Sequence, residues 1–487
     1  MKKQENVERI AAAGSCLLML IAFYAVFTTV LATHTLTIQL LMQVGVLIMV
    51  GAAVWIMLTH PELDRSEIFL WLILVLGILM RVGYMLYTPA YVRGHDLGKC
   101  SLDSNGHVAY ILHLLQGELP PNNSYQFYHP PLFHALSAIA MACYRALSGF
   151  SDPGQLLEAA KTVSCAASIV TLFYARNLCR QLRLSDEATL IAVSLAAFLP
   201  NHYLLAGRVN NDSLAVMFMT AILYYTLRWY KRQEWGALVK LALCFGLGMM
   251  TKISVGVFAL VTGCVMILVL YRRLREKNGL PIIRQFVVFG LIAFPLGLWY
   301  PIRNLILFQQ PFNYVLRISE ESEVYCGGYS LWERFGLIKN FEIYDHPFED
   351  YNVWSYLLKG SLFGEFSFNM GKVIPGLLIL INLLLILLSL AAMALVLIRH
   401  RTAQWTVLIC FWLVLMGSYI NFNIQYPFGC TMDFRYVVPT ALIGAVFLAK
   451  WWEEIPQNRK CLFRKGVVGL TGLYAIFSLV LCCNLTW

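Results

Sequence analysis

The chain has 487 residues, of which 59% are hydrophobic and only 13% are charged, and its formal net charge is +10. This composition excludes a water-soluble globular protein and is typical of a polytopic membrane protein. The positive charge does not indicate nucleic-acid binding, because the basic residues cluster at the ends of apolar runs, as in YRRLREK at 271–277. That placement is typical of cytoplasmic loops between membrane spans.

The apolar runs predict an all-α membrane protein. They are about 17 to 25 residues long, which suits an α-helix that crosses the hydrocarbon core, and they lack the alternation of outer-membrane strands. The first run has no small-residue cleavage site, so we expect it to be retained. About thirteen spans are expected, at 10–32, 38–59, 67–88, 157–175, 185–206, 213–228, 237–250, 253–271, 285–302, 373–398, 404–421, 436–449 and 466–483.

The stretch YQFYHPPLFHAL at 125–136 opens a helix of a different kind. This helix is short, begins beside a double proline, and carries His134 and Arg145. If it crossed the membrane, every later loop would change sides and the basic clusters would move outside, against the usual charge distribution. We therefore expect a juxtamembrane helix that lies flat in the outer interface, with its tyrosines at headgroup depth.

A flat helix places four loops on the outer face, together with the hairpin that carries Lys252; the loops are 89–156, 207–212, 303–372 and 422–435. Loops of such length in a compact protein are usually functional or disordered, and their aromatic content argues against disorder. Cys100, Cys326 and Cys430 lie in these loops and could pair, although the sequence establishes no bond between them.

Three aspartates are candidates for acid–base chemistry in these loops. Asp96 and Asp103 lie in the first outer loop, near His95 and His107, and could equally belong to a solvated polar loop. Asp212 follows Arg208, Asn210 and Asn211 in a polar turn between two apolar helices, where it could instead serve as a helix cap.

Cations stand near the same face. Lys252 and Arg303 each lie where a span meets the outer side, and snorkelling to lipid phosphate would explain either one alone. Acidic loops and cations at one interface are what the handling of a lipid phosphate requires. Glu365 lies in a Gly-containing aromatic turn. Asp433 and Arg435, at the mouth of a later span, could be an anchoring ion pair.

The order of these motifs resembles the GT-C superfamily of membrane glycosyltransferases. The resemblance rests on the acidic first loop, YHPPLFH, the aspartate that ends GRVNND, the TK after a Gly-containing helix, and WYPIRN. It is strongest to bacterial relatives of the protein O-mannosyltransferases and of the aminoarabinose transferases that modify lipid A. It covers 67–306, which becomes the catalytic module; 1–66 adds two leading spans, 307–372 is a large outer loop, and 373–487 holds the C-terminal spans.

The resemblance implies a transferase that takes a sugar from a polyprenyl-phosphate donor on the outer face. The first-loop acid of the family falls on Asp96 or Asp103, and the second on Asp212. The family's adjacent Asp-Glu pair is absent, and RGHDLG with a downstream DSNGH stands in its place. We favour Asp96 as the base.

The remaining roles follow from the same resemblance and from the chemistry of each side chain. Arg303, Lys252 and Arg208 are the expected phosphate-binding cations, since guanidinium and ammonium groups suit phosphate oxygens. The expected substrate-binding residues are His95, His107, Tyr128, His129 and Glu365. No cofactor is certain, and dependence on a divalent metal stays open.

The expected reaction is a displacement that inverts the anomeric carbon, in which a carboxylate removes the proton of the attacking acceptor hydroxyl. The phosphate leaving group is already a stable anion, so no second carboxyl is needed as an acid. The acceptor is a protein, a lipid or a cell-wall glycan, and membrane lipids surround the enzyme. We expect a multi-pass plasma-membrane protein whose site faces outside, or an endoplasmic-reticulum protein in a eukaryote. Two alternatives are a lipid or solute transporter, which would show a repeat or mid-membrane ionisable residues, and a structural subunit that needs none of the three aspartates.

Overall fold

The computed structural model describes residues 35–316, 318–338, 341–343, 350–364, 371–456 and 462–485. Within these ranges the regular secondary structure is helical. The described residues contain no strand, and one isolated β-bridge joins Tyr325 and Phe428. The predicted all-α class is confirmed. The predicted span at 10–32 and the predicted site residue Glu365 lie outside the described residues.

Helices occupy each of the other twelve predicted spans: α2 (Thr35–Thr59), α3 (Arg65–Tyr87), α6 (Pro153–Gln181), α7 (Asp186–Ala197) with α8 (Pro200–Ala206), α9 (Asp212–Arg232), α10 (Trp235–Thr251), η3 (Ile253–Phe258) with α11 (Ala259–Arg275), α12 (Leu280–Phe308), α15 (Val373–Arg399), α16 (Ala403–Gln425), α17 (Val438–Glu454) and α18 (Leu462–Asn484). Shorter helices fill the loops: α4 (His107–Leu115), η2 (Tyr125–Tyr128), α5 (Leu132–Ser148), α13 (Leu331–Phe335), α14 (Val353–Phe363), η4 (Gly429–Met432) and η5 (Phe434–Tyr436).

The predicted number of spans is not confirmed. Among the described residues, eight helices are long and apolar enough to cross a membrane, and the bent pair α7–α8 is a ninth candidate. Helices α10 and α17 have 17 residues each, and α9 carries Asp212 and a basic last turn. These three helices pack inside the bundle, where length and hydropathy are less constrained by lipid.

Capping residues fix where several helices begin. The carboxylate of Asp64 accepts a hydrogen bond of 2.9 Å from the Ser66 amide at the start of α3. At the start of α6, Asp152 accepts one of 2.9 Å from the Gln155 amide, and Pro153 occupies the first helical position. An aspartate cap followed by proline satisfies a free amide and presets the backbone angle, so these starts are encoded locally.

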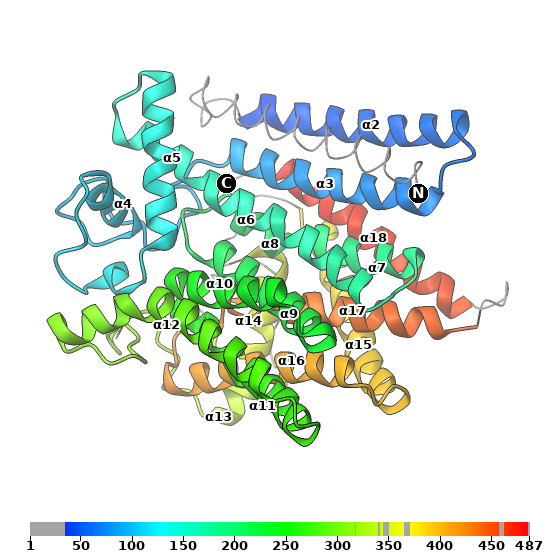
Figure 1. Cartoon of the computed structure of the whole chain (residues 1–487). Coiled ribbons are helices and arrows are strands. Elements are labelled where there is room, and N and C mark those ends of the chain that lie inside the picture. Colours follow the sequence, from blue (N-terminus) through cyan, green and yellow to red (C-terminus); the bar gives the residue numbers. More distant parts are fainter. Residues whose placement is uncertain are drawn as a thin grey trace.

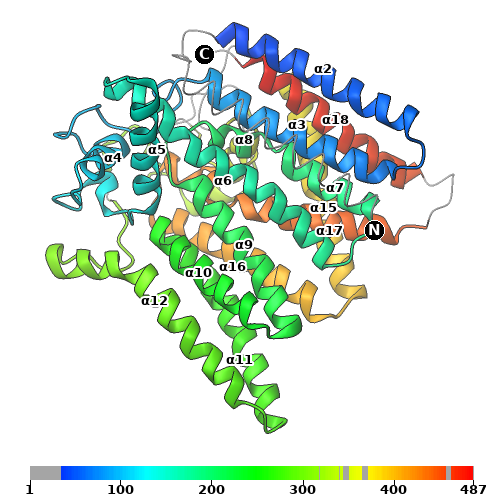
Figure 2. The same ribbon diagram turned by 45° about the horizontal axis from the view of Figure 1, so that its top comes forward.

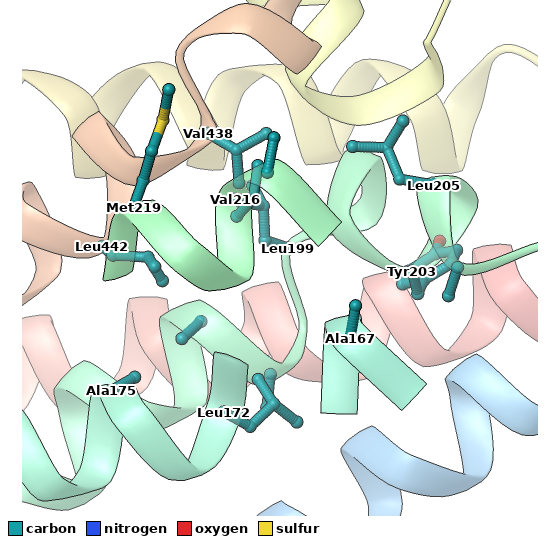
Figure 3. Close-up of a cluster of buried hydrophobic side chains, with 14 of the residues drawn as sticks. Ala167, Leu172, Ala175, Leu199, Tyr203, Leu205, Val216, Met219, Val438 and Leu442 are labelled. Atoms are coloured by element: carbon teal, nitrogen blue, oxygen red, sulfur yellow. The ribbon is translucent and has the colours of Figure 1, made fainter. Parts of the chain in front are cut away.

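Small and large side chains alternate where the central helices cross. Figure 3 shows Ala167, Leu172 and Ala175 of α6 facing Tyr203 of α8 and Val216 of α9, with the α17 side chains alongside. Leu172 and Tyr203 are completely buried. Small residues let helix backbones approach closely, which is the main source of packing between helices in a membrane.

The pair α7–α8 is bent by 54° at Phe198 and Leu199, just before Pro200. Proline cannot continue the α7 hydrogen-bond ladder, so the last carbonyls of α7 need other donors. Arg81 of α3 supplies them: its guanidinium donates to the carbonyls of Ala197, at 2.9 Å, and Ala196, at 3.4 Å. The break is thereby stabilised in a fully buried place.

Helix α5 has 17 residues and runs across the long helices, beyond one end of α3 and α6 (Figures 1 and 2). It begins directly after the double proline, with Pro131 as its cap. Its length is at the lower limit for a span, so the crosswise direction, and not the length, is what agrees with the predicted juxtamembrane position. Figure 2 also shows α12 bending toward its C-terminal end, and this helix contains Pro295 and Pro301, which break its hydrogen bonding.

A basic crevice lies at the far end of α9 from Asp212. It has a volume of about 660 Å³ and lies between the ends of α6 and α9 and the start of α16. Its charged residues are all basic: Arg180, Arg183, Arg228, Lys231 and Arg232. Positive charge at one end of the bundle is the pattern expected of a cytoplasmic face.

Candidate active site

A polar cavity of about 260 Å³ lies at the end of the bundle opposite the basic crevice. Segments that are distant in the sequence enclose it: the first loop, the starts of α9 and η3, the loop after α12, and the C-terminal half of α16 with η5. The predicted site residues that line it are Asp96, His107, Tyr128, His129, Asp212 and Lys252. These six residues thus surround one space, and their role as a site stays a prediction. We call this space the reaction cavity.

Asp212 is the most firmly held acid in the reaction cavity. Its backbone amide donates to the Asn210 side-chain oxygen at 2.8 Å, and Ser164 of α6 donates to the Asn210 carbonyl at 3.1 Å. Asn211 donates its side-chain amide to the Thr251 carbonyl at the end of α10, at 3.2 Å. The polar turn before α9 thus ties three helices together and presents a buried carboxylate, which is 3% exposed, at the cavity wall.

Two cations meet this carboxylate. Lys252 hydrogen-bonds to Oδ1 of Asp212, and the Arg435 Nε lies 3.6 Å from Oδ2. Arg435 also lies 3.5 Å from a carboxylate oxygen of the buried Asp433. The ring of Tyr436 lies beneath both cations, 4.8 Å from the Lys252 Nζ and 5.1 Å from the Arg435 guanidinium carbon. A paired, ring-stacked arrangement is what keeps such charges tolerable when they are largely buried.

Asp96 is exposed and lies at the junction of two cavities. It lines the reaction cavity and also a second polar cavity of about 720 Å³, formed by residues 96–106 with Tyr125 and Gln126, which we call the loop cavity. The Asp96 carbonyl accepts a hydrogen bond from the His107 amide at 2.9 Å, and its φ is +55°. Asp103 lines only the loop cavity. The two acids that the sequence left as alternatives therefore occupy different places.

His129 and His134 of the stretch 125–136 form a buried stack with His107 beneath the reaction cavity. The Nδ1 of His107 lies 2.8 Å from the Nε2 of His134, and the ring of His129 stacks parallel to His107 at 6.1 Å. Tyr110 stacks on His134 at 3.9 Å. Burial lowers the pKa of His107 to about 4 and lowers the pKa of His129 and His134 well below the usual range. These rings are neutral at pH 7 and support the cavity without a charge of their own.

Helix α12 holds η2 in position through its C-terminal end. Tyr300 donates its hydroxyl to the Phe127 carbonyl at 2.6 Å, and Arg303 donates to the Pro120 carbonyl and the Asn304 side chain, both at 2.9 Å. Arg303 does not line the reaction cavity. In this structure its guanidinium is engaged with the first loop, and its predicted contact with a donor phosphate stays a prediction.

Arg208 and His95 lie behind the cavity wall. Arg208 is 2% exposed, and a Cβ added to Gly364 would come within 2.8 Å of its guanidinium. His95 is close enough to Arg208 and Arg435 to feel their charge: burial, and then these two cations, lower its pKa well below the usual range. Neither residue lines the reaction cavity.

Sequence reasoning missed the role of Arg435 and its neighbour Tyr436. It took Arg435 as an anchor at the mouth of a span, because an arginine beside an aspartate there has an ordinary explanation. Gln126 also lines the cavity and was not singled out. The only signal in the sequence was the position of Asp433, Arg435 and Tyr436 in a polar outer loop.

Among the described residues, no group of three or more His, Cys, Asp and Glu side chains is arranged to hold a metal ion. Two of the three loop cysteines, Cys100 and Cys326, are free thiols. The pairing that the sequence left open is therefore not formed between these two residues. The polar chemistry of the reaction cavity belongs to its acids, cations and tyrosines.

A third cavity, of about 640 Å³, lies beside the reaction cavity and is almost entirely apolar. Helix α16 separates the two: Leu415, Ser418 and Tyr419 face the reaction cavity, while Trp412, Leu413, Met416 and Ile420 face the apolar one. The remaining walls come from α14, α15 and α17. A polar and an apolar cavity thus share one helix as their common wall.

Comparisons with known proteins agree with this arrangement. Residues 129–299 match the family described as dolichyl-phosphate-mannose-protein mannosyltransferase. No curated protein sequence matches the chain. Two crystal structures of ArnT from Cupriavidus metallidurans are similar. The one bound to undecaprenyl phosphate has a TM-score of 0.51 at 11% identity, and the apo state has 0.52 at 12%; each match covers 85% of this chain and 75% of ArnT.

At such low identity the structural likeness establishes the fold, and the family match covers the segment from the histidine stack to the end of α12. The resemblance expected from the sequence is confirmed: the chain has the fold of ArnT, and its segment 129–299 is similar to a family of membrane mannosyltransferases.

Proposed function

We propose that this protein transfers a sugar from a polyprenyl-phosphate donor to a hydroxyl group of an acceptor. The observation that carries the proposal is the meeting of Asp96, Lys252 and Arg435 in one polar cavity that shares a wall with an apolar one. A prenyl phosphate sugar needs both environments, because its chain is apolar and its phosphate and sugar are polar. The similar ArnT structure bound to undecaprenyl phosphate supports a donor of this class.

Lys252 and Arg435 are the proposed phosphate-binding groups. Each belongs to a different segment, and their side chains converge on Asp212. The Asp212 carboxylate keeps both cations in place before the donor arrives, and the phosphate then adds a second anion to the same pair. An arginine can grip two phosphate oxygens through its planar fork, while a lysine acts as a point charge.

Asp96 is the proposed base. It is exposed to the reaction cavity and to the loop cavity, so it can reach an acceptor that enters from the loops. The acceptor oxygen attacks the anomeric carbon as its proton passes to the Asp96 carboxylate, and the bond between that carbon and the phosphate oxygen breaks. The polyprenyl phosphate leaves with the bonding electrons, already stabilised by the cations, and the anomeric configuration is inverted.

The site is proposed to face the outer side of the plasma membrane, or the lumen of the endoplasmic reticulum in a eukaryote. The basic crevice at the opposite end of α9 supports this orientation, because lysine and arginine accumulate in cytoplasmic loops. The crosswise direction of α5 agrees with this orientation. If α5 does not cross the membrane, all later loops stay on the sides that the charge distribution predicts.

The test is a transfer assay with the full-length protein in nanodiscs and labelled undecaprenyl-phosphate sugars. We expect release of undecaprenyl phosphate and a product whose anomeric configuration is inverted. Asp96→Asn should retain donor binding and lower turnover by about 100-fold or more, the usual effect of removing a general base. Asp103→Asn is the comparison: Asp103 lines only the loop cavity, so turnover should fall much less than in Asp96→Asn.

The reverse pattern, with Asp103→Asn inactive and Asp96→Asn active, would move the base to Asp103. Donor movement between leaflets without any transfer would indicate a transporter instead. A protein that neither binds nor transfers any polyprenyl-phosphate sugar would contradict the proposal.

A further inference from the structure

The loop cavity is a separate space on the water side of the reaction cavity. Its wall consists of residues from the first loop and from η2, and the two cavities share Asp96 and Gln126. A molecule in the loop cavity would therefore reach the proposed base directly. The chemistry of its wall indicates what kind of molecule that is.

Gln126 is a buried polar side chain at the junction. The residue is 6% exposed, and its backbone amide donates to the Asn105 carbonyl at 3.3 Å. Its side-chain amide has no hydrogen bond with the described residues, although it lines both cavities. Its nitrogen and oxygen remain accessible from the cavities, where a carboxamide can donate two hydrogen bonds and accept two. The geometry points to a ligand that satisfies it.

Two strained residues also line the loop cavity. Asp96 and Tyr125 have φ values of +55° and +42°, and neither is at a helix C-terminus. The other non-glycine residues with positive φ in the described chain, Arg183, Gln233, Lys277 and Gln309, all follow the ends of helices, where this conformation is routine. Strain away from helix ends concentrates at functional sites, so this pair agrees with a binding role.

The wall of the loop cavity is suited to a polyhydroxylated ligand. It contains no aliphatic side chain: besides Asp96, Tyr125 and Gln126, it is made of Gly98, Lys99, Ser101, Asp103, Ser104, Asn105 and Gly106. Tyr125 is 57% exposed and provides a flat apolar face beside amide, carboxylate and hydroxyl groups. A sugar ring presents hydroxyls at its edge and C–H groups on its faces, so it can use both.

We propose that the loop cavity binds a saccharide unit of the acceptor, and that the hydroxyl to be glycosylated belongs to a glycan. This inference rests on the proposed function for its biological meaning, whereas saccharide binding itself does not require transfer. A peptide acceptor would need apolar recesses for its side chains, and the loop cavity has none.

The test measures saccharide binding in the absence of any donor. Full-length protein in nanodiscs is incubated with methyl glycosides of glucose, galactose, mannose and N-acetylglucosamine and with their disaccharides, and saturation-transfer NMR reports contact. We expect binding of at least one probe in the millimolar range. Gln126→Leu should weaken it by about 2- to 12-fold, the effect of losing one neutral hydrogen bond.

Tyr125 allows a sharper comparison. Tyr125→Asn removes the ring while tolerating positive φ, so it should weaken the binding of the same probe without loss of folding. Tyr125→Phe keeps the ring and should bind nearly as well as wild type. Tyr91→Asn, an equally exposed tyrosine of the first loop outside both polar cavities, is the matched control and should change nothing.

Absence of binding by every probe, or equal binding by wild type, Gln126→Leu and Tyr125→Asn, overturns the saccharide site. Transfer to a serine-containing peptide together with no saccharide binding would leave the proposed function standing and remove this inference. Saccharide binding that depends on Tyr125, without transfer from any donor, would leave the saccharide site standing and contradict the proposed transferase function.

Discussion

Two pairs of buried cations serve different purposes in this molecule. Arg81 and Lys161 are completely buried between α3, α6 and α8, and their donors are directed mainly at backbone carbonyls, although Lys161 also forms an ion pair with Glu158 of its own helix. Lys252 and Arg435 instead line a cavity and share the carboxylate of Asp212. The first pair terminates helices, and the second pair presents charge to a space that a ligand can enter.

The first pair shows how a membrane protein ends a helix inside its own core. Arg81 bonds to the last carbonyls of α7, and Lys161 bonds to the carbonyls of Met85 and Thr88 at the end of α3, at 2.7 and 2.6 Å. Water would otherwise satisfy these carbonyls, but it is excluded there. A buried cation is thus not by itself evidence of a binding site. The groups to which it donates hydrogen bonds show whether it stabilises a helix end or faces a cavity.

Arg81→Gln should have the largest effect on stability. At least two buried carbonyls would lose their partners, at about 1 to 3 kcal/mol each, so we expect the free energy of unfolding to fall by about 3 kcal/mol or more. Denaturant unfolding in detergent, followed by tryptophan fluorescence, measures the loss. Donor affinity of the folded fraction should stay within about 2-fold of wild type. Unchanged stability would contradict the helix-terminating role.

Lys252→Gln should have the opposite profile. The glutamine amide can still donate to Asp212 and Arg435 stays beside it, so we expect a smaller loss of stability than in Arg81→Gln, while the donor phosphate loses a charged contact worth about 1.5 to 3 kcal/mol. Donor Kd should therefore rise about 10- to 150-fold, and Arg435→Gln should behave alike. Lys359→Gln, whose ion pair with Asp350 lies outside the reaction cavity, is the control. Wild-type donor affinity in both cavity variants would remove them from the phosphate site.

The histidine stack predicts acid sensitivity of the fold. The pKa of His107 is lowered to about 4 in the folded chain, against about 6.5 when unfolded. Above pH 6.5 His107 is neutral in both the folded and the unfolded chain, and no stability is lost. Below pH 6.5 His107 takes up a proton in the unfolded chain but not in the folded chain, so the folded chain becomes less stable. The contribution of His107 is lost progressively from pH 6.5 to 4 and amounts to about 2 kcal/mol at pH 5.

Unfolding measured at pH 7 and pH 5 checks this effect, with His107→Gln as the comparison. Between pH 7 and pH 5 the free energy of unfolding should fall by about 2 kcal/mol less in the variant than in the wild type. The other buried histidines are still present in the variant, so part of the pH dependence should remain. An identical pH dependence in the variant and the wild type would show that His107 contributes nothing to it.

Arg303→Lys should have the smallest effect and distinguishes the two accounts of this residue. If Arg303 positions the first loop, the lysine ammonium can keep only one of the two charge-assisted hydrogen bonds, so stability should fall by about 1.5 kcal/mol, and donor Kd stays near wild type. If it grips the donor phosphate, as the sequence predicted, donor Kd should rise with little change in stability. Parallel unfolding and donor-binding measurements decide between them.

Helix positions could be predicted well because the information is local. An apolar run of sufficient length forms a helix wherever it lies, and twelve of the thirteen predicted spans coincide with described helices. The start of α5 was predictable for a related reason, since its double proline is visible in the sequence, and its crosswise direction agrees with the flat position that the basic residues predict. The break between α7 and α8 was not predicted, although Pro200 marks it, because a proline in an apolar run has several outcomes.

The candidate site was predictable only as a set of loops. That Asp212 and Lys252 share one face followed from topology, but that they form an ion pair depends on how α9 packs against α10 and η3. The same packing brings Arg435 to Asp212 and leaves Arg303 outside the reaction cavity. Both arginines have the same local signature, an outer-loop position at the end of a span, so no local pattern could rank them.

The sequence by itself determined the helical class, the membrane environment and the face on which the polar loops gather, because each depends on hydropathy and charge along the chain. Only the tertiary structure decided which acids and cations meet, which lysine or arginine ends a helix, and which cavity lies beside which. Ion pairs and hydrogen bonds act over a few ångströms, and the distance between residues so far apart in sequence is set by the packing of whole helices.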